Sequence, residues 1–295
     1  MKAAPFEYSR PSDIDEACAL LAADENARII AGGQTLVPMM AMRLSRPTRL
    51  IDINRIDALS YIREEGDGIA IGATTRQYTV EHDRLIATRL PLLAKAMPWI
   101  GHVATRARGT VGGSLANADP AAELALIAIT LDATLTYRVV GQSISVPASE
   151  FFVGPMTTAL PPGACLTAVR FPLRRRSGKI GTGFHEVNAR RSDFAFVSAA
   201  VQLSLGVDNT CRRLAIGIGA LGDFPIRLTK AEQKLTGTRL EPKAVEASLR
   251  AALAKVDALS DLHASADYRR RVAVKLAARA IADAVKEARV ASHAH

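Results

Sequence analysis

Two glycine-containing segments decide how this sequence is interpreted: residues 29–44, IIAGGQTLVPMMAMRL, and residues 108–124, RGTVGGSLANADPAAEL. Each places a pair of glycines, Gly32-Gly33 or Gly112-Gly113, between an apolar segment and a hydroxyl residue. Backbone amides beside such glycines can approach a phosphate closely, and the hydroxyl adds a donor. One such turn is more typical of ordinary loop structure. When two turns of similar design occur in one domain, phosphate binding and ordinary loop structure are equally good interpretations.

Helices and strands are expected to alternate around the first turn. Ser12 and Asp15 resemble a capping box at the start of a helix, residues 27–31 predict a strand that ends in the glycine turn, and Gly66-Asp67-Gly68 predicts a hairpin. Further elements are expected as follows: strands in RLIDI, ATLTYRVV, QSISV and CLTAVRFP; helices over residues 75–100 apart from Pro91 and Pro98, and in AAELALIAITLD; and a long irregular loop in ATRARGTVGGSLANADP.

A boundary is expected at Pro172 and the basic run Arg174–Lys179, which together are typical of a linker. It divides the chain into a domain of residues 1–173 and one of residues 174–295. The second domain is predicted to be α+β, a three-stranded antiparallel sheet followed by helices. Its strands are expected in GTGFHEVNA, FAFVSAAVQLSLGV and RRLAIGIGAL, with a turn at Asp208-Asn209, and its helices in EPKAVEASLRAALAKV and ADYRRRVAVKLAARAIADAVKEAR.

The composition excludes several classes of protein. With 48% hydrophobic and 23% charged residues among 295, the chain can bury a large core. No apolar stretch reaches the roughly 20 residues of a membrane helix, and the start has no signal-peptide pattern, so a cytoplasmic protein is expected. The three cysteines form no C-x-x-C pair, which argues against a disulfide framework, a zinc site or an iron–sulfur cluster in this chain.

The net charge of +9 leaves a nucleic-acid partner open. However, only 5% of the residues are aromatic, which makes a base-stacking surface a poor interpretation. The basic residues of the last predicted helix, among them Arg269, Arg271 and Lys275, are expected to form a solvated face.

Other motifs give little support to other chemistries. Gly217-x-Gly219-x-x-Gly222 matches a dinucleotide fingerprint, but Pro225 follows at once and prevents the helix that such a loop must open. Motifs of serine hydrolases, zinc proteases and P-loop proteins are absent from the sequence. The tail that contains His293 and His295 is expected to fray rather than bind metal.

With both glycine turns considered, the chain resembles over its whole length the FAD-binding medium subunits of molybdenum hydroxylases. This is the family of xanthine dehydrogenase, aerobic carbon monoxide dehydrogenase and bacterial N-heterocycle hydroxylases. The stretches that carry the resemblance are IIAGGQTLVPMMAMRL, LIDINRI, IGATTR, RGTVGGSLANADPAAEL and FHEVNARRSDFAFVSAAV. The resemblance implies a vanillyl-alcohol-oxidase-like (PCMH-type) FAD domain of two α/β subdomains, followed by a domain with a small antiparallel sheet and helices.

The resemblance also implies which residues contact a non-covalently bound FAD. Glu123 stands where many relatives have Asp and is expected at the ribitol or ribose hydroxyls. Phe194 matches a position beside the isoalloxazine, His185 a position that is Lys in eukaryotic relatives, Leu166 a residue of the flavin pocket, and Ile100 a position that is aromatic in some relatives. The first pyrophosphate loop would consist of Ile30, Ala31, Gly32, Gly33, Gln34, Thr35, Leu36 and Val37, and the second of Thr110, Val111, Gly112, Gly113 and Ser114.

The function implied is electron transfer, with no catalytic acid or base and no metal ligand in this chain. The molybdenum cofactor would lie in a large partner subunit and the [2Fe-2S] clusters in a small one, in an (αβγ)2 heterohexamer. The substrate preference is for N-heterocyclic or related organic compounds, with an aerobic carbon monoxide dehydrogenase as the alternative, although such enzymes usually have His where Gln34 stands. A self-sufficient flavin oxidase and a basic RNA-binding module are the alternatives from other classes.

Overall fold

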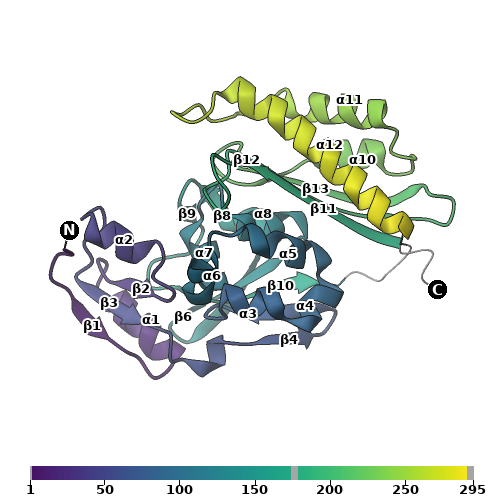
Figure 1. The fold of residues 1–295 in the computed structure, drawn as a ribbon. Coiled ribbons are helices and arrows are strands. Elements are labelled where there is room, and N and C mark those ends of the chain that lie inside the picture. Colours follow the sequence, from purple (N-terminus) through teal and green to yellow (C-terminus); the bar gives the residue numbers. More distant parts are fainter. Residues whose placement is uncertain (1, 174–178, 291–295) are drawn as a thin grey trace. The chain divides into compact units, whose positions relative to one another are not determined.

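The chain forms two compact units in the computed structural model, which describes residues 2–173 and 179–290. Unit 1 contains the described residues up to Leu85, with residues 102–118 and 133–172 (Figure 1). Unit 2 contains residues 86–101, 119–132 and the described residues from Leu173 onward. Residues 174–178 of the predicted linker lie outside the described residues, as do His293 and His295, whereas Pro172 and Lys179 are the ends of two strands. None of the described helices is long and apolar enough to cross a membrane.

Unit 1 holds a three-stranded parallel sheet and a five-stranded antiparallel sheet. The parallel sheet has the order β1-β3-β2, and the antiparallel sheet has the order β4-β5-β10-β6-β7. The strands are β1 (Glu7–Ser9), β2 (Arg28–Ile30), β3 (Arg49–Asp52), β4 (Ile62–Glu65), β5 (Gly68–Gly72), β6 (Thr134–Val139), β7 (Gln142–Pro147) and β10 (Cys165–Pro172), with the small pair β8 (Phe152–Gly154) and β9 (Thr157–Thr158) beside them.

Short helices connect these strands. The connection from β2 to β3 contains α2, as a parallel pair requires a crossover, whereas β4 and β5 are joined by a tight turn at Gly66, whose φ is 60°. The helices of this unit are α1 (Ile14–Ala23), α2 (Leu36–Ala41), η1 (Asp57–Leu59), α3 (Gln77–His82), α6 (Val103–Arg108), α7 (Val111–Asn117) and α9 (Ala148–Phe151), while α4 (Arg84–Arg89) spans the division between the units.

Two predictions for unit 1 were wrong in detail. The N-cap of α1 is Asp13 rather than Ser12: Asp13 Oδ1 accepts from the Glu16 amide at 2.9 Å, and Glu16 reaches back to the Ser12 amide at 2.7 Å. The motif is therefore shifted by one residue, with Asp13 as the cap and Glu16 as the residue that bonds back. The expected irregular loop at residues 104–120 contains the helices α6 and α7, because Thr110 caps the second helix in spite of its glycines.

The core next to the parallel sheet contains Cys18, Ile51 and Cys165, all buried. Burial raises the pKa of the Cys165 thiol to about 12, so this thiol is inert. All three cysteines of the sequence are free and buried. Among the described residues no group of three or more His, Cys, Asp or Glu could hold a metal ion.

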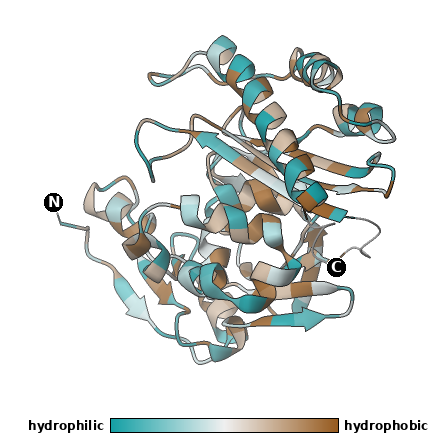
Figure 2. Cartoon of the chain, turned by 45° about the vertical axis from the view of Figure 1, so that its right-hand side comes forward, coloured by the Kyte–Doolittle hydropathy of each residue, from teal (hydrophilic) through white to brown (hydrophobic). Residues whose placement is uncertain are grey.

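Unit 2 is a four-stranded antiparallel sheet with helices packed against it. The order is β11-β12-β13-β14, so the sheet contains the three predicted strands and a fourth, short strand at its edge. The sequence analysis predicted neither this fourth strand, β14, nor the helix α10. Figure 2 shows hydrophilic and hydrophobic residues intermixed along these elements, as expected where each has one buried face. The elements are α5 (Pro91–Ala96), η2 (Met97–Trp99), α8 (Glu123–Thr130), β11 (Lys179–Val187), β12 (Val197–Leu205), β13 (Cys211–Gly219), β14 (Ile226–Arg227), α10 (Thr229–Leu235), α11 (Pro242–Leu253) and α12 (Ala266–Val290).

Glycines allow helices to lie directly on this sheet. A Cβ at Gly183 would lie 2.0 Å from the carbonyl oxygen of Ala280 in α12, and a Cβ at Gly217 would lie 1.9 Å from Thr130 Oγ1 in α8. Gly217 and Gly219 of the dinucleotide-like motif therefore lie in β13 and serve helix–sheet packing.

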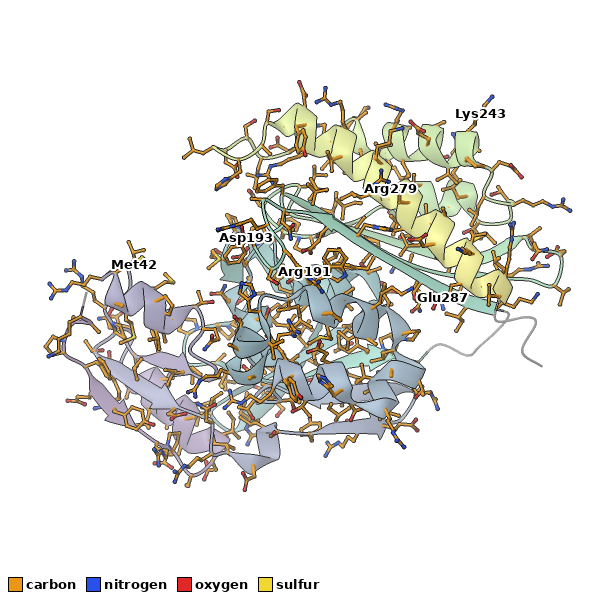
Figure 3. The ribbon with its side chains drawn as sticks, viewed as in Figure 1. Met42, Arg191, Asp193, Lys243, Arg279 and Glu287 are labelled. Atoms are coloured by element: carbon orange, nitrogen blue, oxygen red, sulfur yellow. The ribbon has the colours of Figure 1, made fainter. Side chains whose placement is uncertain are left out.

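Arg269 corrects the expectation of a fully solvated basic face on α12. Its side chain is buried and donates to the carbonyl oxygens of Ala220, at 2.8 Å, and of Phe196, and to Asp261 Oδ2 at 2.6 Å. Arg271 and Lys275 are exposed as expected. At the free edge of the sheet, Glu287 of α12, labelled in Figure 3, accepts from the Thr182 amide at 3.0 Å.

Candidate cofactor-binding site

The first glycine segment forms a loop with unpaired amide groups between β2 and α2. Gly33 has a φ of 70°, a left-handed conformation that favours glycine, and its carbonyl accepts from the Val37 amide at 3.0 Å. In the described chain, the backbone amides of Gly33, Gln34, Thr35 and Leu36 have no acceptor. These residues are exposed or half-buried, so the loop presents several successive N–H groups, the arrangement that binds phosphate.

The second glycine segment has a different role from the one expected. Its amides are already bonded within the chain: Val111 to the Thr75 carbonyl at 3.0 Å, Gly112 to the Ala73 carbonyl at 2.8 Å, and Gly113 to Thr110 Oγ1 at 3.1 Å. The expectation that its N–H groups are free is therefore wrong, because Thr110 acts as the N-cap of α7. What this segment presents to solvent is the backbone at Gly113, which is exposed, beside the half-buried Ser114.

The two glycine segments nevertheless lie against each other in unit 1. A Cβ at Gly32 would lie 2.5 Å from the carbonyl oxygen of Arg108 and 2.8 Å from the Cα of Gly109. Any side chain at Gly32 would therefore force the backbone of one segment away from the other. Glycine at this position lets the loop after β2 pack on the start of the Thr110–Ser114 segment.

Asn54 and Arg76 join the two segments, and sequence reasoning missed both. Asn54 Nδ2 donates to the Ala31 carbonyl at 2.8 Å, and Arg76 Nη2 donates to Asn54 Oδ1 at 2.8 Å. Arg76 Nη1 donates to the Arg108 carbonyl, and burial is the main reason why the pKa of Arg76 is lowered. The available signal was that both residues follow strands in LIDINRI and IGATTR, two stretches that carry the family resemblance.

The other predicted site residues are divided between the units. Leu166 is buried in β10 of unit 1. Ile100, Glu123, His185 and Phe194 belong to unit 2, where Ile100 is buried after η2 and Glu123 is the first residue of α8.

His185 is engaged inside unit 2. Its Nε2 lies 2.7 Å from Asp283 Oδ2 on α12, which favours a contact between sheet and helix as its role. Phe194 is 74% exposed in the loop after β11, so it is not a core residue of the sheet. The signal for its exposure was the polar run Arg190-Arg191-Ser192-Asp193 before it.

These residues fit a dinucleotide cofactor with a pyrophosphate. The unpaired amides at Gly33–Leu36 supply neutral donors that do not need a neighbouring lysine, and Gly32 removes the side chain that would separate the two segments. The exposed backbone at Gly113 adds a second surface without a Cβ.

Two known protein families match consecutive parts of the chain. Residues 4–174 match the family described as the FAD binding domain in molybdopterin dehydrogenase, and residues 182–284 match the CO dehydrogenase flavoprotein C-terminal domain. The chain therefore belongs to the family of FAD-binding medium subunits of molybdenum hydroxylases, a family of oxidoreductase subunits.

Similar proteins agree with this assignment over nearly the full length. The chain is 36% identical to 6-hydroxypseudooxynicotine dehydrogenase complex subunit alpha of Paenarthrobacter nicotinovorans, with 98% of this chain and 97% of the relative covered. It is 36% identical to the nicotine 6-hydroxylase medium subunit of the same organism, with 96% and 99% covered. A chain of quinoline 2-oxidoreductase from Pseudomonas putida 86 superposes with a TM-score of 0.92 at 32% identity, with 98% and 99% covered.

The fold expected from the resemblance is confirmed by solved structures. Chains of carbon monoxide dehydrogenase from Hydrogenophaga pseudoflava superpose with a TM-score of 0.93 at 32% identity, covering 97% of this chain and 99% of that chain. The FAD-binding domain followed by a smaller antiparallel-sheet domain is thus shared with medium subunits of this family.

Proposed function

We propose that this chain binds FAD without a covalent bond and passes electrons from [2Fe-2S] clusters of a partner subunit to an external acceptor. The observation that carries the proposal is the run of unpaired amides from Gly33 to Leu36, held against the second glycine segment. Bound FAD would supply the redox chemistry, while the chain holds, orients and shields it.

We propose that the pyrophosphate lies on the amides of the first loop, residues 30–37. The hydroxyl of Ser114 and the exposed backbone of Gly113 would line the same site from the second segment, residues 110–114. Glu123 would accept hydrogen bonds from ribitol or ribose hydroxyls, Leu166 and Ile100 would line the flavin pocket, and Phe194 would lie beside the isoalloxazine. The bond between His185 and Asp283 supports a structural role for His185 instead.

We propose that the complex hydroxylates an N-heterocyclic or related organic compound. Two relatives carry names of nicotine-derived substrates, and another, 34% identical, is named caffeine dehydrogenase subunit beta. An aerobic carbon monoxide dehydrogenase is the alternative, supported by a medium chain 32% identical to this one. Gln34 favours the first assignment because carbon monoxide dehydrogenases usually have His there.

The partners proposed are a large subunit with the molybdenum cofactor and a small subunit with the [2Fe-2S] clusters. We propose an (αβγ)2 heterohexamer in the cytoplasm, with the boundary between the two domains of this chain near residues 173 and 174.

The test is to express the chain alone and together with its two partners. The isolated chain should be yellow, release all its flavin on acid precipitation, and oxidise no N-heterocycle. The three-subunit complex should show flavin reduction by substrate. Turnover by the isolated chain would support a self-sufficient oxidase instead, and a colourless chain that binds no added FAD would overturn the proposal.

A further inference from the structure

Glu186 lies in a row of three residues across the sheet of unit 2. The strand register pairs Glu186 of β11 with Ser198 of β12, and Ser198 with Gly219 of β13. Glu186 shares a face of β11 with Phe184, whose ring packs on Trp99, whereas the alternating His185 faces Asp283 of α12. The row therefore lies on the side of the sheet that α8 covers, and Leu126 of α8 lies 3.5 Å or less from the position of a Cβ at Gly219.

This row encloses two polar atoms that have no hydrogen-bond partner. Glu186 is only 9% exposed and Ser198 only 1%. Glu186 Oε1 accepts from Asn188 Nδ2 at 2.8 Å, but Glu186 Oε2 and Ser198 Oγ are both enclosed without a partner in the described chain. Because Gly219 carries no side chain, the third position of the row adds neither a donor nor an acceptor. An ionised Glu186 carboxylate with one buried oxygen that accepts no hydrogen bond would cost free energy.

The charges around Glu186 do not offset an ionised form. The carboxyl group that acts on it from α8 is Glu123, and the neighbouring Asn188 gives it only a neutral donor. On the following loop, Arg190 is bonded to Asp193 at 3.1 Å. Two basic groups of other elements are engaged elsewhere: His185 with Asp283 on the opposite face, and Lys95 with Glu287 and the Thr182 carbonyl.

Burial first, and the neighbouring Glu123 second, raise the pKa of Glu186 to about 8. Asp119 lies just before α8, where its carboxylate accepts from the Ala121 amide at 2.9 Å. Its own burial raises its pKa as well. Interacting carboxyl groups titrate as a pair rather than independently.

We propose that Glu186 carries a proton at neutral pH and serves as a positioning residue for the Glu123 side chain at the first turn of α8. The inference rests on the proposed function, because Glu123 is there assigned to the hydroxyl groups of FAD. When Glu186 loses its proton, the two carboxylates repel, and Glu123 leaves the position in which it accepts hydrogen bonds from the cofactor. FAD binding by this chain is thus predicted to weaken at alkaline pH.

The proton on Glu186 makes the free energy of unfolding depend on pH in a definite direction. The folded protein keeps the Glu186 proton up to pH of about 8, whereas the unfolded chain releases it near the ordinary glutamate value of about 4.5. Over this window the folded state binds more protons, so the free energy of unfolding falls as pH rises. Glu186→Gln imitates the neutral acid in shape and cannot lose a proton, and therefore removes this part of the pH dependence.

The first experiment measures the thermal midpoint of the full-length chain across this pH window, with Glu150→Gln as the control at an exposed glutamate. The wild type and Glu150→Gln should lose stability together as pH rises, and Glu186→Gln should lose less, becoming the more stable protein at alkaline pH. The wild-type infrared spectrum should show the carbonyl stretch of a protonated carboxylic acid at neutral pH and lose it at alkaline pH. Identical pH profiles for both variants, or no such infrared band, would overturn the proposal.

The second experiment measures FAD affinity by quenching of flavin fluorescence over the same pH range. The wild type should bind FAD at least about tenfold more weakly above the Glu186 pKa than at neutral pH, a difference of about 1.4 kcal/mol, while Glu186→Gln keeps its affinity. If the stability profiles differ but both proteins bind FAD equally at every pH, the positioning role is wrong although Glu186 holds a proton. If neither protein binds FAD at any pH, the proposed function itself fails, and the stability result still decides the protonation of Glu186.

Discussion

Arg76 donates from Nη2 to Asn54 Oδ1 at 2.8 Å, and this bond joins the segment after β5 to the segment after β3. Because Asn54 also holds the Ala31 carbonyl and Arg76 the Arg108 carbonyl, the pair sets the separation of the two glycine segments. Neither residue needs to touch a cofactor to control the shape of the site. The relationship explains why polar residues follow these two strands.

Arg76→Met should weaken FAD binding while the chain remains folded. It removes two charge-assisted hydrogen bonds that hold the two glycine segments in place, and the resulting loss of preorganisation is expected to weaken FAD binding about tenfold, or by about 1.4 kcal/mol. Fluorescence titration with FAD measures the loss. The matched control is Arg63→Met, because Arg63 is exposed and pairs only with the exposed Glu65 among the described acidic groups. Equal affinities for both variants would show that the Arg76–Asn54 pair does not shape the site.

Gly33→Ala should lower FAD affinity more than its cost in stability explains. The φ of 70° makes alanine unfavourable by about 1 kcal/mol, and the added Cβ would lie 3.1 Å from Val37 Cγ2 and disturb the unpaired amides. Gly141→Ala is the control, since Gly141 has a φ of 76° and no atom within 4 Å of an added Cβ. Both variants should lose similar thermal stability, but only Gly33→Ala should lose FAD. If both variants retain FAD, the first loop is not part of the FAD-binding site.

Gly112→Ala and Gly113→Ala should separate stability from binding. A Cβ at Gly112 would lie 2.4 Å from Ala73 Cβ and 2.7 Å from Ala73 Cα, so overpacking of about 1–3 kcal/mol is expected. A Cβ at Gly113 would meet only Thr110 Oγ1, at 2.7 Å, so the gain from alanine as the better helix former is offset by a disturbed N-cap of α7. Gly113→Ala should therefore be less destabilised than Gly112→Ala but bind FAD more weakly than the wild type. Chemical denaturation measures the stability of both variants, and titration with FAD measures their affinity. If Gly113→Ala binds FAD as tightly as the wild type, Gly113 has no role in FAD binding.

The sequence predicted elements with strong local patterns and failed where contacts from distant residues decide. Strands β6, β7 and β10 and the buried helix α8 follow from apolar periodicity, and the resemblance to a known family was confirmed. The bonding of the Val111 and Gly112 amides to Thr75 and Ala73 could not be predicted, because the acceptors lie more than 30 residues earlier in the chain. The Arg76–Asn54 bond could not be predicted either, because its partners lie 22 residues apart and follow different strands.

Arg269→Met should destabilise the protein, whereas Arg271→Met on the same helix should not. Loss of the buried guanidinium leaves the Phe196 and Ala220 carbonyls without this donor, and a buried unsatisfied group costs about 1–3 kcal/mol. Arg271 is exposed, and surface substitutions usually change stability by at most about 0.5 kcal/mol. Urea denaturation of the two variants gives the comparison. Equal stabilities would contradict the structural role assigned to Arg269.

Phe194→Ala should leave the fold and the FAD content unchanged but alter the flavin spectrum and its reaction with acceptors. The ring is 74% exposed, so truncation removes little packing. The loop that carries it is held by other residues: the Asp193 amide donates to the Arg190 carbonyl at 3.0 Å, and Asn188 Nδ2 donates to the Asp193 carbonyl at 3.4 Å (Figure 3 labels Arg191 and Asp193). An exposed aromatic residue on a fixed loop is therefore available to cover a flat ligand.

The control for Phe194 is Leu262→Ala, which removes an even more exposed apolar side chain in the same unit. If Phe194 covers the isoalloxazine, only Phe194→Ala shifts the flavin absorbance, because an apolar contact excludes water from the ring, and only this variant reacts faster with small soluble acceptors. The amides of the first loop are unchanged, so both variants should bind FAD to the same extent. Identical spectra and reoxidation rates in the two variants would leave Phe194 without contact to the flavin and would assign its exposed ring to another surface of the complex.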